Sequence, residues 1–384
     1  MDHINPKIDA LTSLRFFAAA LIVIGHSKGL FGIPTGWLDR LPTDQGVTFF
    51  FVLSGFILTY VYPNIKNSAD AHNFVIARVA RIWPAHLATF LLSLVMYPWA
   101  PAILKTGYGQ LAAVLNLALI QAWVPVQAIY FSFNAVSWSI SVELFFYLNF
   151  IWLISNIETT WFRKLLFSLI GAVSMIILSR FLNVPLHGIN PFGVDGDGLL
   201  YISPLSRIFE FVFGMSAAVA FQRLRRSVLL TGKLATAIEI TLVVTVIALF
   251  FIEHSDWVKH GLPVRLLPIE LRFWLVRSGA APLYATMIVI FAFQSGVVSK
   301  KLSSSILVLL GEISYSIYLL HQILSVWVMS HPGLVGFIPP YVGYPLYLVA
   351  TVLGSYAMWR FVERPCRAAI TKRLIRRPVV RSAA

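Results

Sequence analysis

Long runs of apolar residues alternate with short polar connections along the whole chain. Most runs hold about 18–24 residues, enough for an α-helix to cross a hydrocarbon core of roughly 30 Å. A transmembrane barrel would instead show alternating segments of about ten residues, which these continuous runs do not resemble. The predicted membrane spans are residues 11–30, 46–63, 83–104, 110–124, 137–156, 164–182, 204–222, 231–252, 279–297, 305–330 and 343–362.

The connections differ in charge, and this difference predicts the side of the membrane on which each one lies. Residues 124–137 and 331–342 contain neither Lys nor Arg, and 183–203 contains only acids. Cytoplasmic loops carry an excess of Lys and Arg, so the basic connections and both chain ends are expected in the cytoplasm. The basic connections hold Lys66, Arg78 and Arg81; Arg163 and Lys164; Arg223, Arg225 and Arg226; Lys300 and Lys301; and the arginine-rich tail.

The short segment 110–124 conflicts with this alternation. The chain must cross an odd number of times between the basic connection 64–82 and the uncharged connection 124–137, but two spans, 83–104 and 110–124, are predicted between them. We interpret the segment as re-entrant or lying along the membrane. The expected fold is an all-α polytopic integral membrane protein with about ten transmembrane helices and this one additional short segment. Residues 1–366 are expected to form one membrane domain, followed by a short basic cytoplasmic tail at 367–384.

Composition agrees with a membrane protein. Of 384 residues, 58% are hydrophobic and 12% are charged, whereas a soluble domain carries roughly 25% charge. The net charge of +14 raises the question of nucleic-acid binding, but the basic residues follow the loops and the tail, as the positive-inside rule requires. We therefore expect the lipid bilayer, and no nucleic acid, as a partner. The single cysteine, Cys366, excludes an intramolecular disulfide framework.

The first span carries two ionisable residues, Arg15 and His26. Eleven residues make three turns plus about 20°, so both side chains share one helical face, roughly 16 Å apart along the axis. Such groups inside a span are costly and indicate function; here, an anionic ligand held at one point and modified at another. A snorkelling arginine and a core histidine bonded to a carbonyl would give the same pattern.

Three further groups of polar residues could carry chemistry. Arg78 and Arg81 lie on one helical face and suit phosphate recognition, although the positive-inside rule alone also explains them. Ser139 and Glu143 are i,i+4 neighbours, with Tyr147 one turn further. A polar stripe at i, i+4, i+7 and i+11 lines either a cavity or a helix contact; its members are Ser314, Tyr318, His321 and Ser325.

Two other polar features are interpreted as structural. Ser54 and Gly55 in an apolar run allow two helices to approach closely, and Arg207 and Glu210 form an i,i+3 pair. The remaining histidines show no HExxH or other recognisable ligand spacing, so no metal site is expected. No Walker A loop, GxSxG elbow or GxGxxG turn occurs in its required context either.

Seven stretches, in this order, resemble those of the integral-membrane acyltransferase family 3, which includes O-acetyltransferases of bacterial surface and exported polysaccharides. The stretches cover nearly the whole chain. They are Arg15 to His26, FFFVLSGF at 49–56, RVARIWP at 78–84, SWSISVE at 137–143, RIFEFVFG at 207–214, GEISYSIYLLH at 311–321 and FVERP at 361–365.

The resemblance implies a role for each matched residue. The expected catalytic residues are His26, Arg15 and Glu143. Contacts to the phosphates of coenzyme A are expected from Arg78 and Arg81, with Arg15 steadying the donor. The substrate cavity is expected to be lined by Trp138, Ser139, Tyr318 and His321.

The function that the resemblance implies is transfer of an acyl group, most simply acetyl, from cytoplasmic acetyl-CoA to a hydroxyl of a lipid-linked or exported polysaccharide. Histidine supplies a base that works near neutral pH, but whether His26 acts as that base or carries the acyl group covalently stays open. The alternatives are a lipid or small secreted acceptor, or a secondary transporter. Inverted repeats or paired broken helices would favour a transporter, and the sequence shows no convincing repeat. The expected location is the bacterial cytoplasmic (inner) membrane; the oligomeric state is left open.

Overall fold

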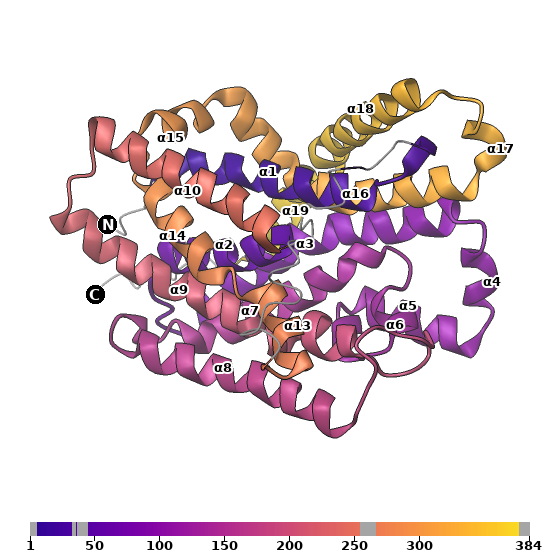
Figure 1. The fold of residues 1–384 in the computed structure, drawn as a ribbon, viewed down its shortest axis with the longest axis horizontal. Coiled ribbons are helices and arrows are strands. Elements are labelled where there is room, and N and C mark those ends of the chain that lie inside the picture. Colours follow the sequence, from indigo (N-terminus) through magenta and orange to yellow (C-terminus); the bar gives the residue numbers. More distant parts are fainter. Residues whose placement is uncertain (1–5, 33–35, 37–44, 254–265, 376–384) are drawn as a thin grey trace, which may run out of the picture.

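The computed structural model describes residues 6–32, 36, 45–253 and 266–375. Within these residues every regular element is a helix, and Figure 1 shows the long helices packed into one bundle. The α-helices are α1 (Asp9–His26), α2 (Gln45–Val61), α3 (Ser68–Met96), α4 (Ala100–Leu104), α5 (Gly107–Leu117), α6 (Gln127–Tyr130), α7 (Trp138–Leu153), α8 (Ile157–Phe181), α9 (Pro204–Ser227), α10 (Gly232–Glu253), α13 (Ile269–Ser278), α14 (Ala281–Ala292), α15 (Val297–Leu302), α16 (Ser305–Ser330), α17 (Pro332–Val335), α18 (Pro340–Met358) and α19 (Arg364–Leu374). Short 3-10 helices are η1 (Leu30–Gly32), η3 (Gln121–Trp123) and η4 (Ala135–Ser137), and π-helices are η5 (Asp197–Ile202) and η6 (Trp359–Glu363).

Eight helices or continuous helical stretches in the described part of the chain are long and apolar enough to cross a membrane. Two further apolar helices, α2 with 17 residues and α18 with 19 residues, are not among these eight. The all-α polytopic membrane class is thus confirmed, and the count of ten crossings stays a prediction. The 11-residue α5 covers only the first part of the short segment 110–124, because it ends at Leu117. Its length of about 16 Å is too small to cross the hydrocarbon core.

The third span is longer than predicted. Helix α3 begins at Ser68 rather than near residue 83, because Asn67 caps it by accepting a hydrogen bond from the backbone N–H of Asp70 at 2.9 Å. Arg78 and Arg81 therefore lie within the helix that continues into the membrane span, and not, as predicted, in the preceding connection. The prediction took the start of the apolar run as the start of the helix, and the polar first turns of α3 lie before that run.

The described C-terminal segment is helical as far as Leu374. The predicted boundary between residues 366 and 367 falls within α19, which packs against α3. Two stretches lie outside the described residues: the last part of the predicted tail, 376–384, and residues 254–265 of the connection between the predicted spans 231–252 and 279–297.

Helices α2 and α9 approach each other closely through two glycines. A β-carbon at Gly55 would overlap the backbone carbonyl of Phe211, and one at Gly214 would overlap the carbonyl of Val52. The small residues thus allow backbone-to-backbone packing, as is usual between helices in membranes. The structural interpretation of Gly55 is confirmed, and Gly214 is its counterpart on the partner helix.

A buried ion pair within α9 lies beside α2. Arg207 Nε and Glu210 Oε2 are 3.1 Å apart and both side chains are fully buried. The guanidinium also donates to the hydroxyls of Thr48 (3.0 Å) and Ser278 (3.2 Å), which connects α9 to α2 and α13. Because its donors are used within the bundle, this pair has the expected structural role.

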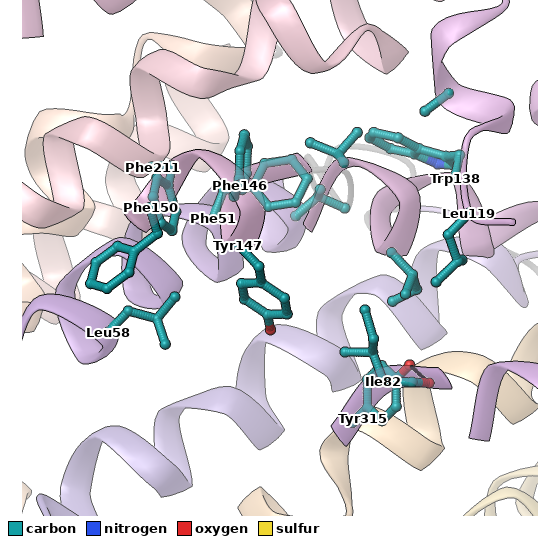
Figure 2. Packing of buried hydrophobic residues seen from close by; sticks show 14 of the residues in the cluster. Phe51, Leu58, Ile82, Leu119, Trp138, Phe146, Tyr147, Phe150, Phe211 and Tyr315 are labelled. Atoms are coloured by element: carbon teal, nitrogen blue, oxygen red, sulfur yellow. Dashed lines mark hydrogen bonds between the residues drawn. The ribbon is translucent and has the colours of Figure 1, made fainter. Parts of the chain in front are cut away.

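An aromatic cluster fills the space between α2, α3, α7 and α9. The rings of Phe146 and Phe211 stack at 4.7 Å between centroids, and Phe51 meets Phe146 edge-on at 5.0 Å. Figure 2 shows Phe146, Phe150 and Phe211 lying together, with Tyr147 turned away from them. This orientation, set by successive positions on α7, sends the Tyr147 hydroxyl toward the polar interior described below.

The glycine contact gives a first prediction. Replacing Gly by Ala in a helix normally adds up to about 1 kcal/mol of stability, but in Gly214→Ala the added methyl meets the α2 backbone. We expect a loss of about 1–3 kcal/mol instead, seen as a lower midpoint in thermal unfolding of the detergent-solubilised protein. Gly333→Ala is the control, since no atom of the described residues lies within 4 Å of its β-carbon position. A Gly214→Ala protein as stable as the control would contradict the contact.

Candidate functional site

A cavity of about 700 Å³ lies within the bundle and collects most of the predicted site residues. It is lined by α1, α2, α3, α7 and α16 and by the segment from Trp359 to Arg367. Six of the predicted site residues line this one cavity: Arg15, Arg78, Arg81, Ser139, Glu143 and Tyr318. Spans that are far apart in the sequence thus contribute to one polar space.

The charge of this cavity wall is predominantly positive. Three carboxylates, Glu143, Glu312 and Glu363, face six cations. Lys7 at the rim is paired with Glu312 at 2.9 Å, but among the described residues Arg15, Arg78 and Arg81 form no salt bridge. The six cations are Lys7, Arg15, Arg78, Arg81, Arg364 and Arg367. A wall with this excess of cationic groups favours an anionic ligand.

Arg78 shows most clearly that protein groups do not satisfy these cations. Its side chain is 7% exposed, and its Nη2 donates to the hydroxyl of Tyr62 at 3.3 Å. The Nε is buried without a hydrogen-bond partner among the described residues. A buried guanidinium donor without an acceptor costs free energy, and an anionic ligand can supply the missing acceptor.

Glu143 is held at the cavity wall by neighbouring hydroxyls. Its Oε1 accepts hydrogen bonds from Tyr147 at 2.5 Å and from Ser54 at 3.3 Å. The carboxylate also interacts electrostatically with Arg15 and Arg81. Ser54 is a site residue that sequence reasoning missed, because a serine beside a glycine was interpreted only as a helix contact.

Ser139 and Tyr318 meet at the cavity wall. Their hydroxyl oxygens are 2.8 Å apart, and both lie within hydrogen-bond distance of the Val136 carbonyl, at 3.1 and 3.0 Å. The phenol ring of Tyr318 also contacts the ring of His321, with 5.9 Å between centroids. Tyr318 thus connects the cavity wall to the histidine one turn further along α16.

His321 and His26 do not line the cavity, but they contact each other. His26 Nδ1 and His321 Nε2 are 3.0 Å apart. The Nδ1 of His321 lies 3.1 Å from the Ile317 carbonyl, which can only accept, so this Nδ1 carries the hydrogen. In a pair of neutral imidazoles, His321 Nε2 is then the acceptor and His26 Nδ1 the donor. The basic lone pair of His26 is consequently placed on Nε2.

The two histidines differ in their surroundings. His321 is fully buried on α16, whereas His26 is an exposed side chain at the last residue of α1.

Trp138, the remaining predicted cavity residue, is 4% exposed. It packs against the rings of Phe51 and Tyr201 and is not among the residues that line the cavity.

Two arginines of the C-terminal segment were missed as site residues. Arg364 and Arg367 line the cavity, and the Arg364 guanidinium lies 4.8 Å from the centre of the Trp359 ring. The sequence held a signal in the FVERP stretch at 361–365, but its single arginine, like those of the tail, was assigned to topology alone. A basic residue near a membrane end satisfies the positive-inside rule whether or not it also binds a ligand.

The cationic cavity and the histidine pair within a helical bundle are features of a polytopic membrane protein that acts on an anionic ligand. A model of the acyltransferase domain family matches residues 8–360. The chain therefore belongs to this family of acyl-transferring membrane proteins, as the seven matching stretches predicted.

Several relatives support the assignment. Acyltransferase MdmB of Streptomyces mycarofaciens is 30% identical over 227 residues, which are 56% of this chain and 57% of that protein. O-acetyltransferase OatA of Staphylococcus aureus is 25% identical over 378 residues, 94% of this chain and 57% of OatA. Nodulation protein 10 of Rhizobium leguminosarum bv. viciae is 24% identical over 399 residues, covering 98% of both chains. The matches thus span just over half the length of the first two relatives. No solved structure is significantly similar to the chain.

The cavity predicts an effect of removing one inner arginine. If Arg81 binds phosphate groups, Arg81→Ala should weaken binding of coenzyme A to the solubilised protein by about 10- to 100-fold, the value of one or two charge-assisted hydrogen bonds. Arg81→Lys should restore only part of this affinity, because a point charge replaces a bidentate fork.

The control for Arg81→Ala is Arg226→Ala, which removes an exposed cation outside the cavity. Calorimetric titration of the purified proteins gives the affinities. Equal affinity of the Arg81→Ala and Arg226→Ala proteins for coenzyme A would leave Arg81 with a topological role only.

Proposed function

We propose that the chain is a membrane O-acyltransferase that transfers an acyl group, most simply acetyl, from cytoplasmic coenzyme A to a hydroxyl of a lipid-linked or exported glycan. The observation that carries this proposal is a cavity with three arginines for which the described part of the chain supplies no salt bridge. This cavity lies at one end of α1, and His26 lies at the other end of the same helix. Family membership supplies the reaction class.

The donor occupies the cationic cavity in this proposal. Arg78 and Arg81 on α3 bind the phosphate groups, and Arg15 on α1 contributes a further cation to the same cavity. The thioester points toward Ser139 and Tyr318. Arg15 and His26 are roughly 16 Å apart along α1, a gap that an extended pantetheine arm bridges once its acyl end passes Tyr318.

The transfer step needs a base for the acceptor hydroxyl. His26 Nε2 removes the hydroxyl proton while the oxygen attacks the thioester carbon; the carbon–sulfur bond breaks and the coenzyme A thiolate leaves, taking up a proton. His321 acts as a positioning residue, because its bond to Ile317 fixes the tautomer and orientation of His26. Glu143 offsets part of the cationic charge beside the donor.

The acceptor is proposed by analogy with relatives. The name of OatA specifies O-acetylation and that of MdmB acyl transfer, which supports a hydroxyl acceptor. A glycan that reaches His26 from outside fits the exposure of this side chain at the end of α1. Mass spectrometry of surface glycans and of lipids, with and without the protein, separates a glycan from a lipid acceptor.

The membrane orientation follows from the position of the donor. Pro6, Lys7, Arg364 and Arg367 all line the same cavity, so the beginning of α1 and the beginning of α19 are on one side of the bundle. With coenzyme A in the cytoplasm, this side faces inward in the bacterial cytoplasmic membrane, and the chain crosses an even number of times.

Reporter fusions test this orientation. Fusions at residue 225 and at the C terminus should be active as cytoplasmic reporters, and fusions within 190–200, where the only charges are acidic, should be active outside. A folded fusion protein whose C-terminal reporter is active outside and inactive in the cytoplasm would place the cavity on the wrong side for coenzyme A.

The histidine pair predicts two variants with different consequences. His26→Gln removes the base, so turnover with acetyl-CoA and the glycan acceptor should fall by about 10²–10⁴-fold, while coenzyme A binding persists. His321→Leu should lower kcat without changing KM for the donor, and His321→Gln should restore part of kcat, because an amide oxygen can accept the hydrogen of His26 Nδ1.

Ser325→Ala serves as the control for the His321 variants. Ser325 lies one turn beyond His321 on α16, and the substitution removes its buried hydrogen bond to Tyr347 on α18. A merely structural effect would lower the amount of folded protein in all three α16 variants without the split between kcat and KM. Near-wild-type turnover of the folded His26→Gln protein would overturn the mechanism.

A further inference from the structure

We infer that the first turn of α19 forms a separate subsite for the 3′-phosphate of the donor nucleotide, through Arg364 and Arg367. The inference rests on the proposed function, because it places the part of coenzyme A that the inner arginines do not reach. It gives the C-terminal segment, which the sequence placed in a basic tail, a role in choosing the donor.

The arginines of the cavity are arranged by depth. Arg78 is 7% exposed and Arg15 and Arg81 are half-buried, whereas Arg364 and Arg367 are exposed. Coenzyme A has its anionic groups in a matching order, with the diphosphate next to the pantetheine arm and the 3′-phosphate on the ribose beyond it. With the thioester innermost, the inner arginines meet the diphosphate and the outer pair meets the 3′-phosphate.

Helix α19 is held against the cavity by a buried carboxylate. Glu363 immediately precedes the helix, is 7% exposed, and accepts a hydrogen bond from the Ser316 hydroxyl on α16 at 3.1 Å. Its charge also interacts with Arg81 and Arg367. Because α19 packs on α3, the inner and outer arginines are carried by neighbouring helices of one assembly.

Arg364 is positioned for anion binding by an aromatic ring. Its guanidinium lies 4.8 Å from the centre of the Trp359 ring, and both side chains line the cavity. Stacking uses the face of a guanidinium, and the N–H donors lie in its plane, so a stacked arginine can still bind phosphate through its edge. Trp359 thereby lowers the conformational freedom that Arg364 would lose on binding.

Anionic lipid headgroups are the other source of phosphate at this position. The chain distinguishes the two by its own layout, because the neighbouring cations Arg360, Lys372 and Arg373 belong to the same segment but do not line the cavity. These residues are suited to the lipid surface, whereas Arg364 and Arg367 face the space that the donor would occupy. Arg373→Ala is therefore a matched control for Arg367→Ala.

The test compares coenzyme A with dephospho-coenzyme A, which lacks only the 3′-phosphate. Calorimetric titration is done on the full chain in nanodiscs of neutral lipid and of anionic lipid. The wild-type protein should bind coenzyme A at least about tenfold more tightly than dephospho-coenzyme A. Arg367→Ala, and more fully the Arg364→Ala/Arg367→Ala protein, should reduce this ratio toward one by weakening coenzyme A alone.

The variants elsewhere should behave differently. Arg81→Ala should weaken both ligands to a similar extent and keep the ratio, and Arg373→Ala should change neither affinity. The subsite would be overturned if the double variant kept the wild-type ratio of affinities for coenzyme A and dephospho-coenzyme A, or if this ratio changed only with the lipid composition. Either result would assign these arginines to the membrane surface.

The wild-type protein separates failure of the subsite from failure of the proposed function. Equal binding of the two ligands, with acyl transfer from both acetylated forms, would overturn the subsite and leave the proposed function standing. Absence of binding and of transfer with either ligand would overturn the proposed function itself.

Discussion

Arginine side chains inside an apolar helix bundle constrain the rest of this structure. Burying a cation without a paired anion is costly, yet Arg15, Arg78 and Arg81 form no salt bridge among the described residues. The bundle meets this cost in two ways. It leaves a cavity of about 700 Å³ beside the guanidinium groups, and it places Glu143 and Glu363 where their charges act on Arg15 and Arg81. By contrast, Arg207, which does not line this cavity, is paired with Glu210 and bonded to two hydroxyls.

Packing and polarity in the bundle depend on the same short segments. In α2, Gly55 allows contact with the α9 backbone, while the preceding Ser54 donates to Glu143 across the cavity wall. On α7, Phe146 packs into the aromatic cluster and the next residue, Tyr147, donates to Glu143. Neighbouring positions on a helix point about 100° apart, so one residue can face the packed interior and the next the cavity. A packing change in such a segment therefore moves a site residue as well.

The sequence predicted the helical class and the polar faces of single helices, because both depend on local periodicity. It placed Arg15 and His26 on one face of α1 and aligned Tyr318 with His321 on α16. It did not predict that His26 and His321, 295 residues apart, meet at 3.0 Å, since periodicity fixes a face relative to its own helix axis but not the helix that it meets. It also missed Arg364 and Arg367, because the positive-inside rule already accounted for basic residues near membrane ends. The start of α3 depended on the cap at Asn67, which lies outside the apolar run.

The identity of the group beside His26 is itself constrained by burial. Histidine bases are often oriented by a carboxylate, but the position of His321 is fully buried, and an ionised carboxylate there would need its own charged partner. A neutral imidazole avoids this requirement. Its Nδ1 is satisfied by the Ile317 carbonyl of the same helix, so its Nε2 is presented to His26 without adding a charge to the apolar interior. In the proposed reaction the cost of this arrangement is a weaker stabilisation of the protonated His26, because a neutral acceptor stabilises an imidazolium less than an anion does. The exposure of His26 at the end of α1 offsets this loss, since water can solvate the imidazolium there while His321 fixes its orientation.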